Sequence, residues 1–153
     1  MNDRQTLLLD TLASPQYQKR LQKANRFERI SGGGTLRQIE RLFIAPSIYI
    51  PYLFYAKAGM SRTYLTTMTL FWGRTVRIPL EDYDALILYM FGGLYGSEMS
   101  LTKFLIKNLG PNDVFYDVGA NRGFYTFLAA DLCKETYTFE PMSLKRTLAL
   151  AIR

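Results

Sequence analysis

A short segment in the second half of the sequence combines acidic residues with residues that favour tight turns. Val114–Val118 is an apolar, β-branched run, typical of a strand that is buried on both faces. The turn Asp117-Val-Gly-Ala-Asn-Arg-Gly123 follows, and a helical pattern begins directly after it. In an open α/β sheet, ligands lie beyond the carboxyl ends of the strands, beside such a strand-to-helix turn. This turn is therefore the first candidate for a binding site.

The residues of the turn have backbone properties that suit a close approach of a ligand. Gly119 permits a tight turn with no side chain in the way of the ligand. Asn121 is the type of non-glycine residue that best tolerates a left-handed backbone, and Gly123 would allow the helix to pack closely on the strand. We therefore expect backbone N–H groups of the turn to face the ligand.

Two carboxylates flank this turn and narrow the choice of ligand. Glu140 ends a second short strand, Tyr137–Phe139, so its carboxylate should lie beside the turn and accept hydrogen bonds from a ribose diol. A dinucleotide fingerprint would place glycines where the chain has Asn121 and Phe124. That departure, together with the carboxylate of Asp117, disfavours an anionic pyrophosphate. A ligand with a cationic amino-acid head, such as S-adenosylmethionine, fits better.

The stretch Gly96–Met142 resembles the opening of FkbM-type S-adenosylmethionine-dependent methyltransferases. The resemblance is specific in Asp117-Val-Gly-Ala-Asn-Arg-Gly123 and in Phe139-Glu-Pro141, whereas Asn112-Asp113 stands where the family usually has Gly-Asp. It implies that the turn meets the methionyl part of the cofactor, that Glu140 holds the ribose hydroxyls, and that Glu98 adds a polar contact at the cofactor mouth. The cofactor-binding residues expected from it are Glu98, Asp117, Gly119, Ala120, Asn121, Gly123, Glu140 and Pro141.

The resemblance also implies a reaction, methyl transfer to a hydroxyl group of a small molecule or a sugar. An acceptor oxygen would attack the sulfonium methyl in line, so the protein supplies alignment and removes the acceptor proton. No catalytic base is assigned, because the residues that would act as one normally follow the second strand. The sequence has no histidine and one cysteine, Cys133, which excludes imidazole bases and multi-cysteine metal sites. We expect no metal and interpret Cys133 as a small core residue.

Helical and strand patterns upstream would position these residues. The expected elements are a basic amphipathic helix Pro15–Ile30, a hinge at Gly32-Gly33-Gly34, a helix from Thr35, a β-hairpin from Tyr64 to Ile78, a short buried helix within Asp82–Tyr95, and a helix 98–109. In the last of these, the predicted buried face is Leu101, Phe104, Leu105 and Leu109, with Gly110 as a left-handed cap.

Strands and helices alternate from Val114 onward, and a further helix is expected from Ser143 to Arg153. This order predicts an α/β fold, the start of a Rossmann-like doubly wound methyltransferase sheet. Residues 1–62 form the predicted helical N-terminal region and residues 63–153 the first part of the cofactor-binding domain. Two strands are too few for such a sheet. We therefore expect an incomplete, N-terminal part of a longer enzyme, inactive alone, whose uncovered faces favour aggregation or oligomerisation.

The net positive charge of the chain, +6, lies in its first 64 residues, which hold ten Lys and Arg against four Asp and Glu. Leu42–Ala56 is an uncharged aromatic stretch that is too short to span a bilayer and contains two prolines. Packing against protein is favoured over shallow insertion at a membrane surface. A cytoplasmic location, peripheral to a membrane if this stretch inserts, is expected. Two alternatives remain open, a non-catalytic cofactor-binding remnant and a basic module for RNA or membrane surfaces, although nucleic acid is not the expected partner.

Overall fold

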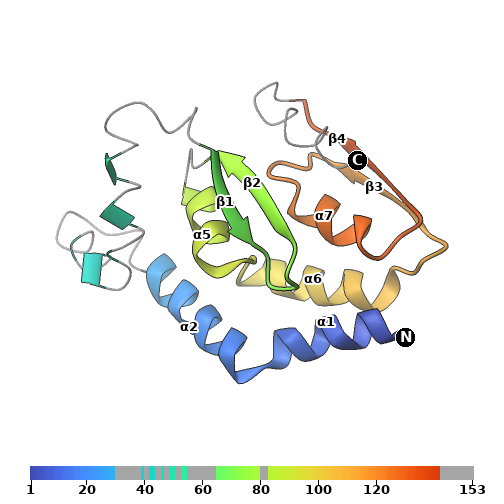
Figure 1. Cartoon of the computed structure of the whole chain (residues 1–153), viewed down its shortest axis with the longest axis horizontal. Helices are drawn as coiled ribbons and strands as arrows, with labels where there is room; N and C mark the ends of the chain where they lie inside the picture. Colours follow the sequence, from blue (N-terminus) through green and yellow to red (C-terminus); the bar gives the residue numbers. More distant parts are fainter. Residues whose placement is uncertain are drawn as a thin grey trace. The chain divides into compact units, whose positions relative to one another are not determined.

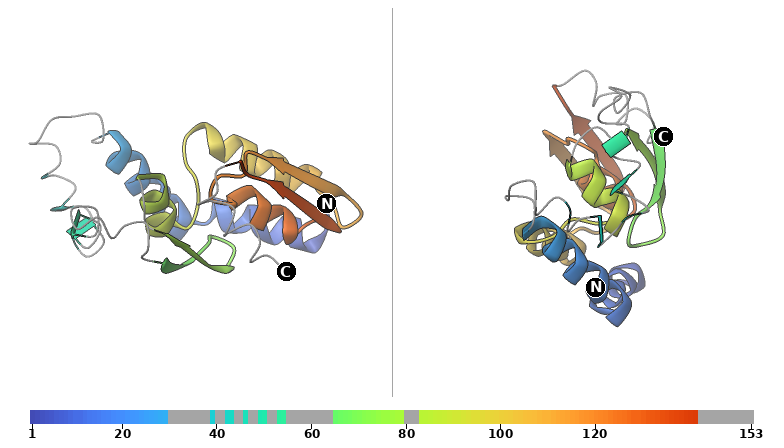
Figure 2. Two further views of the ribbon diagram at one scale, coloured as in Figure 1. Left: turned by 90° about the horizontal axis from the view of Figure 1, so that it is seen from above. Right: turned by 90° about the vertical axis from the view of Figure 1, so that its left-hand side faces the viewer.

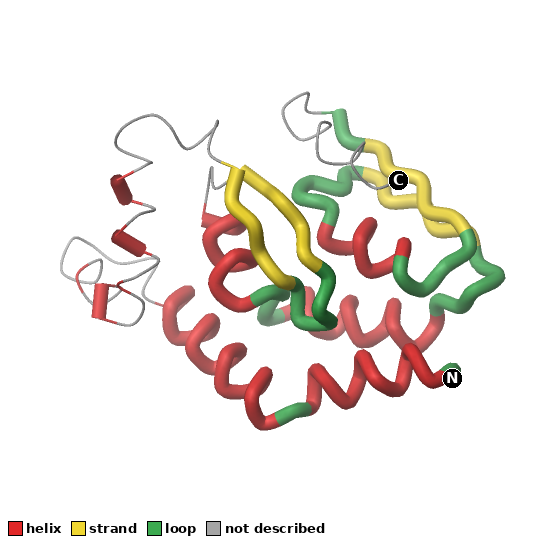
Figure 3. Tube along the Cα trace, in the orientation of Figure 1, coloured by secondary structure: helices red, strands yellow, loops and turns green. Residues whose placement is uncertain are grey.

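The computed structural model describes residues 1–29, 39, 42–43, 46, 49–50, 53–54, 65–79 and 83–141. Over these residues the protein is mixed α/β, with the five helices α1, α2, α5, α6 and α7 and two sheets of two strands (Figure 1, Figure 3). The chain divides into two compact units, Met1–Thr11 with Ser97–Arg153, and Leu12–Gly96. The boundary predicted at residues 62 and 63 and the helix predicted from Ser143 lie outside the described residues, as does most of the helix predicted from Thr35.

The unit Leu12–Gly96 contains the predicted hairpin. Its strands β1 (Leu65–Thr69) and β2 (Thr75–Pro79) pair antiparallel, with Met68 opposite Val76. Alternate residues of both strands are buried, as the period of two requires. Helix α5 (Tyr83–Phe91) packs beside this hairpin (Figure 1, Figure 2). Both the hairpin and the short buried helix predicted from the sequence are therefore confirmed.

The basic amphipathic helix is α2 (Pro15–Arg29), which packs on α5. Its apolar stripe buries Tyr17 and Ala24, while Lys19, Arg20 and Lys23 lie on the more accessible side. Among the described residues, no helix combines the length and the hydropathy that a membrane crossing needs. Most of the stretch Leu42–Ala56 lies outside the described residues, so its predicted packing stays a prediction.

Tyr17 fills a space that exists because residue 93 has no side chain. Its ring contacts that of Phe71 at 5.4 Å between centroids, and a Cβ atom on Gly93 would lie 2.2 Å from the Tyr17 hydroxyl oxygen. Burial raises the pKa of Tyr17 to about 12, with a smaller opposing effect from the Arg20 charge. The phenol therefore stays neutral over the physiological range.

Substituting Gly93→Ala should destabilise this unit by about 1–3 kcal/mol, because the new methyl group overlaps the Tyr17 hydroxyl. Adding Tyr17→Phe should recover most of the lost stability, because it removes the hydroxyl that overlaps the new methyl group. The nearest remaining ring atom, Cζ, lies 3.4 Å from the position of the new methyl carbon, which is an ordinary contact distance. Urea unfolding of the wild type, both single variants and the double variant measures this. Equal destabilisation of the Gly93→Ala chain with and without Tyr17→Phe would contradict the packing described.

The other unit begins with α1 (Asp3–Ala13), which lies in the predicted helical N-terminal region although no separate helix was predicted at these residues. Asn2 and Gln5 form a reciprocal cap: the Gln5 backbone N–H donates to Asn2 Oδ1 at 2.9 Å, and the Asn2 N–H donates to Gln5 Oε1 at 2.6 Å. The Gln5 side-chain amide also donates to the Leu109 carbonyl at 2.8 Å. This buried glutamine ties the first turn of α1 to the end of α6 (Ser97–Asn108).

Helix α6 occupies the predicted position but buries a different face. Leu101 and Phe104, predicted to be buried, are 43% and 59% exposed. The buried residues are Met99, Thr102, Leu105 and Ile106. Thr102 can be buried because its hydroxyl donates to the Glu98 carbonyl at 2.8 Å and so has a polar partner. The predicted left-handed cap at Gly110 is also wrong, because the φ of Gly110 is not positive. Asp113 closes the turn instead: its Oδ2 accepts a hydrogen bond from the Gly110 N–H at 2.7 Å.

Strand β3 (Val114–Val118) and strand β4 (Glu135–Phe139) pair in parallel, with Asp117 opposite Thr138. Helix α7 (Phe124–Ala130) connects them and covers one face (Figure 2). Its apolar side is buried as predicted and comprises Phe124, Phe127, Leu128 and, just beyond the helix, Leu132. A strand, a helix and a second parallel strand are thus present in the predicted order.

The opposite face of this strand pair is exposed, so the prediction that Val114–Val118 is buried on both faces is wrong. Tyr116 is 61% exposed and Val118 is 81% exposed. The rings of Tyr116 and Tyr137 stack at 5.2 Å, and Phe139 lies 6.4 Å from Tyr116 along the same face. Parallel strands are normally covered on both faces. Among the described residues, α7 supplies that cover on one face only.

Candidate functional site

The turn between β3 and α7 has the unusual backbone that its residues predict. Gly119, Asn121 and Gly123 have φ values of 77°, 50° and 74°, all in the left-handed region. The N–H of Gly119 donates to the carbonyl of Phe139 at 2.7 Å, and that of Gly123 donates to the carbonyl of Ala120 at 2.7 Å. The first bond fastens the turn to the end of β4, so the carboxyl ends of both strands meet there.

The two glycines of the turn serve different purposes. A Cβ atom on Gly119 would meet no described atom within 4 Å, so the space beside it is open. A Cβ atom on Gly123 would lie 3.3 Å from the ring of Phe127, within its own helix. The expected close contact between helix and strand is therefore not what requires Gly123. Its positive φ, at the residue that precedes α7, is the constraint.

Glu140 lies where the sequence places it, directly after β4 and beside the turn. Its side chain is 8% exposed, and Oε2 accepts the backbone N–H of Asn121 at 2.7 Å. The left-handed φ of Asn121 belongs to the same turn that presents this N–H to the carboxylate. Pro141 follows at the surface and ends the described part of the chain.

Asp117 is a carboxylate in the covered face of β3, and its burial is explained by a threonine. Asp117 is 9% exposed and Thr126 is 1% exposed, and the Thr126 hydroxyl donates to Asp117 Oδ2. The Thr138 hydroxyl, on the neighbouring strand, lies 3.3 Å from that of Thr126. This chain of hydroxyls gives the carboxylate a donor inside an otherwise apolar layer, which offsets the cost of removing it from water.

Glu98 lies in the first turn of α6, exposed, and is linked to α7 by a tyrosine. The Tyr125 hydroxyl donates to Glu98 Oε2 and lies 3.2 Å from the Glu98 carbonyl oxygen. Burial and the bond to Glu98 raise the pKa of Tyr125 well above its usual value; the charges of Glu98 and Asp117 add to this, and a bond with Thr102 opposes it. Tyr125 is therefore a neutral hydrogen-bond donor at physiological pH.

The three predicted acidic residues thus converge on one short segment, residues 121–126. The Asn121 N–H holds Glu140, the Tyr125 hydroxyl holds Glu98, and the Thr126 hydroxyl holds Asp117. Arg122, in the same segment, is 4% exposed and supplies one positive charge. The carboxylates bonded to this segment therefore outnumber its one cationic side chain.

Sequence reasoning missed Tyr125 and Thr126 as parts of this arrangement. A signal was present: Thr126 is a hydroxyl residue in the apolar helix Phe124–Ala130, and Asp117 is a lone carboxylate in an apolar strand. Each needs a polar partner when buried. Cys133 is half-buried, and burial, followed by the Asp113 charge, raises its thiol pKa, which does not favour a nucleophile. No cluster suited to a metal ion occurs within the described ranges.

Known proteins offer no further guide to this site. No family model matches the chain, and no curated protein and no solved structure is significantly similar to it.

Replacing Thr126→Val should destabilise the unit by about 1–3 kcal/mol, because the buried Asp117 loses its hydroxyl donor at nearly constant side-chain volume. Thr126→Ser keeps the hydroxyl and should retain more of the stability than the valine variant. Denaturant unfolding of the three chains measures the difference. If valine proved as stable as threonine, the Thr126 bond would not be what allows Asp117 to be buried.

Proposed function

We propose that the turn 119–123 binds S-adenosylmethionine and that the chain carries the start of a Rossmann-like methyltransferase domain. One observation carries this proposal: the Glu140 carboxylate bonds to a left-handed turn at the carboxyl ends of two parallel strands, and those of Glu98 and Asp117 bond to the first turn of the helix that follows. Such an edge is where α/β sheets bind their ligands. The motifs that resemble FkbM-type methyltransferases occupy this same turn and strand end.

The donor and acceptor chemistry of the site fits this cofactor. Glu140, at the end of β4, can accept hydrogen bonds from the ribose hydroxyls, while Asp117 and Glu98 suit the cationic amino-acid end. The open space beside Gly119 leaves room for the ligand to approach the backbone. A pyrophosphate would meet carboxylates here, so the surplus of negative charge argues against a nicotinamide dinucleotide.

When bound, S-adenosylmethionine supplies an activated methyl group, and the resemblance makes the acceptor a hydroxyl of a small molecule or a sugar. The residues of this chain would bind and orient the cofactor, which is a large part of what such a transfer requires. None of the described residues is proposed as the base, because Tyr125 has a raised pKa and keeps its proton, and because Glu140 and Asp117 already accept hydrogen bonds from Asn121 and Thr126.

Titration calorimetry with S-adenosylhomocysteine tests the assignment of Glu140. Glu140→Gln keeps an oxygen that can accept the Asn121 N–H but loses the charge, so affinity should fall roughly tenfold. Glu140→Ala also removes the bond to the turn and should weaken binding further. The matched control is Glu135→Gln, the same change at the exposed opposite end of β4, which should leave affinity within about twofold.

Unchanged affinity in both Glu140 variants would contradict the placement of the ribose. Absence of binding by the wild-type chain would overturn the proposed function itself.

A further inference from the structure

Tyr125 links two elements that are far apart in the sequence. It belongs to the first turn of α7, and its hydroxyl contacts both the carboxylate and the carbonyl of Glu98, in the first turn of α6. The neighbouring residue, Thr126, holds Asp117 from the same turn of α7. Two consecutive side chains of one helix therefore fix the positions of two carboxylates from different elements.

We infer that Tyr125 is a positioning residue, which holds the Glu98 carboxylate so that it binds the ammonium group of the ligand's amino-acid end. This inference rests on the proposed function, since it names the part of the cofactor that Glu98 would meet. Glu98 is exposed, and a glutamate at a helix start has several accessible rotamers. A hydrogen bond to a fixed phenol restricts that freedom before the ligand arrives, which lowers the cost of binding.

The surroundings of Tyr125 keep its hydroxyl in place and protonated. Thr102, which is fully buried, donates to the carbonyl of Glu98, so the backbone beneath the carboxylate is also fixed. Because the pKa of Tyr125 is raised, the phenol keeps its proton and acts as the donor of this hydrogen bond. One oxygen of Glu98 is engaged by Tyr125, and the carboxylate has a second oxygen that can accept a hydrogen bond from a cationic donor.

Two ligands that differ mainly in the amino-acid end provide the test. S-adenosylhomocysteine and 5′-methylthioadenosine both contain adenosine and a thioether, but the second has no ammonium or carboxylate group. For Tyr125→Phe, affinity for S-adenosylhomocysteine should fall roughly tenfold, as expected when one charge-assisted contact is misplaced. Affinity for methylthioadenosine should stay within about twofold of the wild type. If the role of Tyr125 were merely structural, the variant would lose affinity for both ligands to the same extent.

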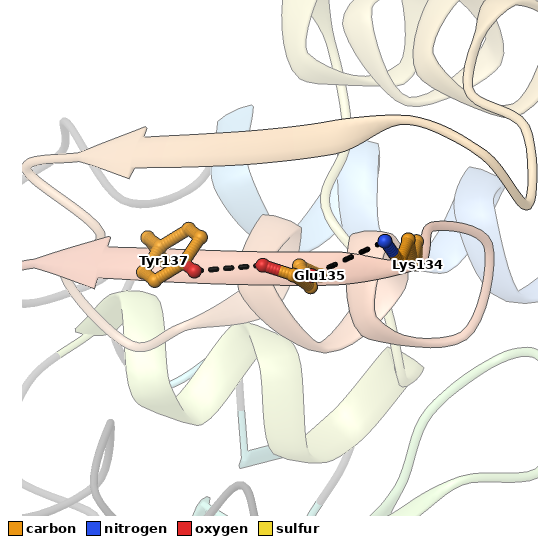
Figure 4. A network of polar contacts seen from close by, with 3 residues as sticks. All are labelled: Lys134, Glu135 and Tyr137. Carbon is orange, nitrogen blue, oxygen red and sulfur yellow. Dashed lines mark hydrogen bonds and ion pairs between the residues drawn. The ribbon is translucent and has the colours of Figure 1, made fainter.

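The chain offers a matched control in the second tyrosine that is bonded to a glutamate. The Tyr137 hydroxyl donates to Glu135 Oε2 at 2.7 Å, and Lys134 approaches the same carboxylate at 3.7 Å (Figure 4). This group lies along β4, where Tyr137 is exposed. Tyr137→Phe therefore removes the same kind of bond away from the turn and should change neither affinity.

A third variant, Glu98→Gln, removes the charge of the proposed contact itself, and calorimetry on the 153-residue chain measures its affinity for both ligands. Glu98→Gln should lower the affinity for S-adenosylhomocysteine but not for methylthioadenosine. Adding Tyr125→Phe to it should lower the affinity little further, because both changes act on one contact. Equal losses for both ligands, no loss, or fully additive losses would overturn the inference and leave the proposed function standing. If the wild type binds neither ligand, the proposed function fails, and this inference fails with it.

Discussion

A carboxylate that is removed from water needs hydrogen-bond donors, and this requirement organises the region between β3 and α7. Glu140 and Asp117 are both less than one-tenth exposed, and each accepts a hydrogen bond from residues 121–126. The left-handed backbone of the turn presents the Asn121 N–H to Glu140, while the start of α7 presents the Thr126 hydroxyl to Asp117. If either donor is lost, a buried charge is left with less compensation, so the turn and its acidic neighbours form one interdependent structure.

The two faces of the small strand pair differ in what covers them. Two parallel strands with one covering helix are a minimal α/β element, and the stacked rings of Tyr116 and Tyr137 lie on a face that no described residue covers. The polar bonds of the turn lie at the other side and at the strand ends. The candidate site and the exposed aromatic face thus belong to different surfaces of one unit, and the properties of one do not decide those of the other.

Local patterns in the sequence predicted most of the elements but not the contacts between them. The hairpin, α2, α5, β3, α7 and β4 follow from periodicity, turn residues and apolar runs, and the meeting of Glu140 with the turn follows from parallel strand geometry. The buried face of α6 could not be predicted in this way, because apolar Leu101 and Phe104 stay exposed while Thr102 is buried with its hydroxyl bonded to the backbone carbonyl of Glu98. The roles of Tyr125 and Thr126 depend on partners 27 and 9 residues away, which no local period reveals.

The most direct test of the central claim is a ¹H–¹⁵N NMR titration of the chain with S-adenosylhomocysteine. Binding at the turn predicts saturable shifts of the amide signals of Gly119, Ala120, Asn121 and Glu140, with little change in the hairpin Leu65–Pro79. The Asn121 signal is the most informative, because its N–H already donates to the carboxylate that would hold the ribose. Signals of the turn that stay unmoved at millimolar ligand, or shifts confined to the unit Leu12–Gly96, would contradict the account.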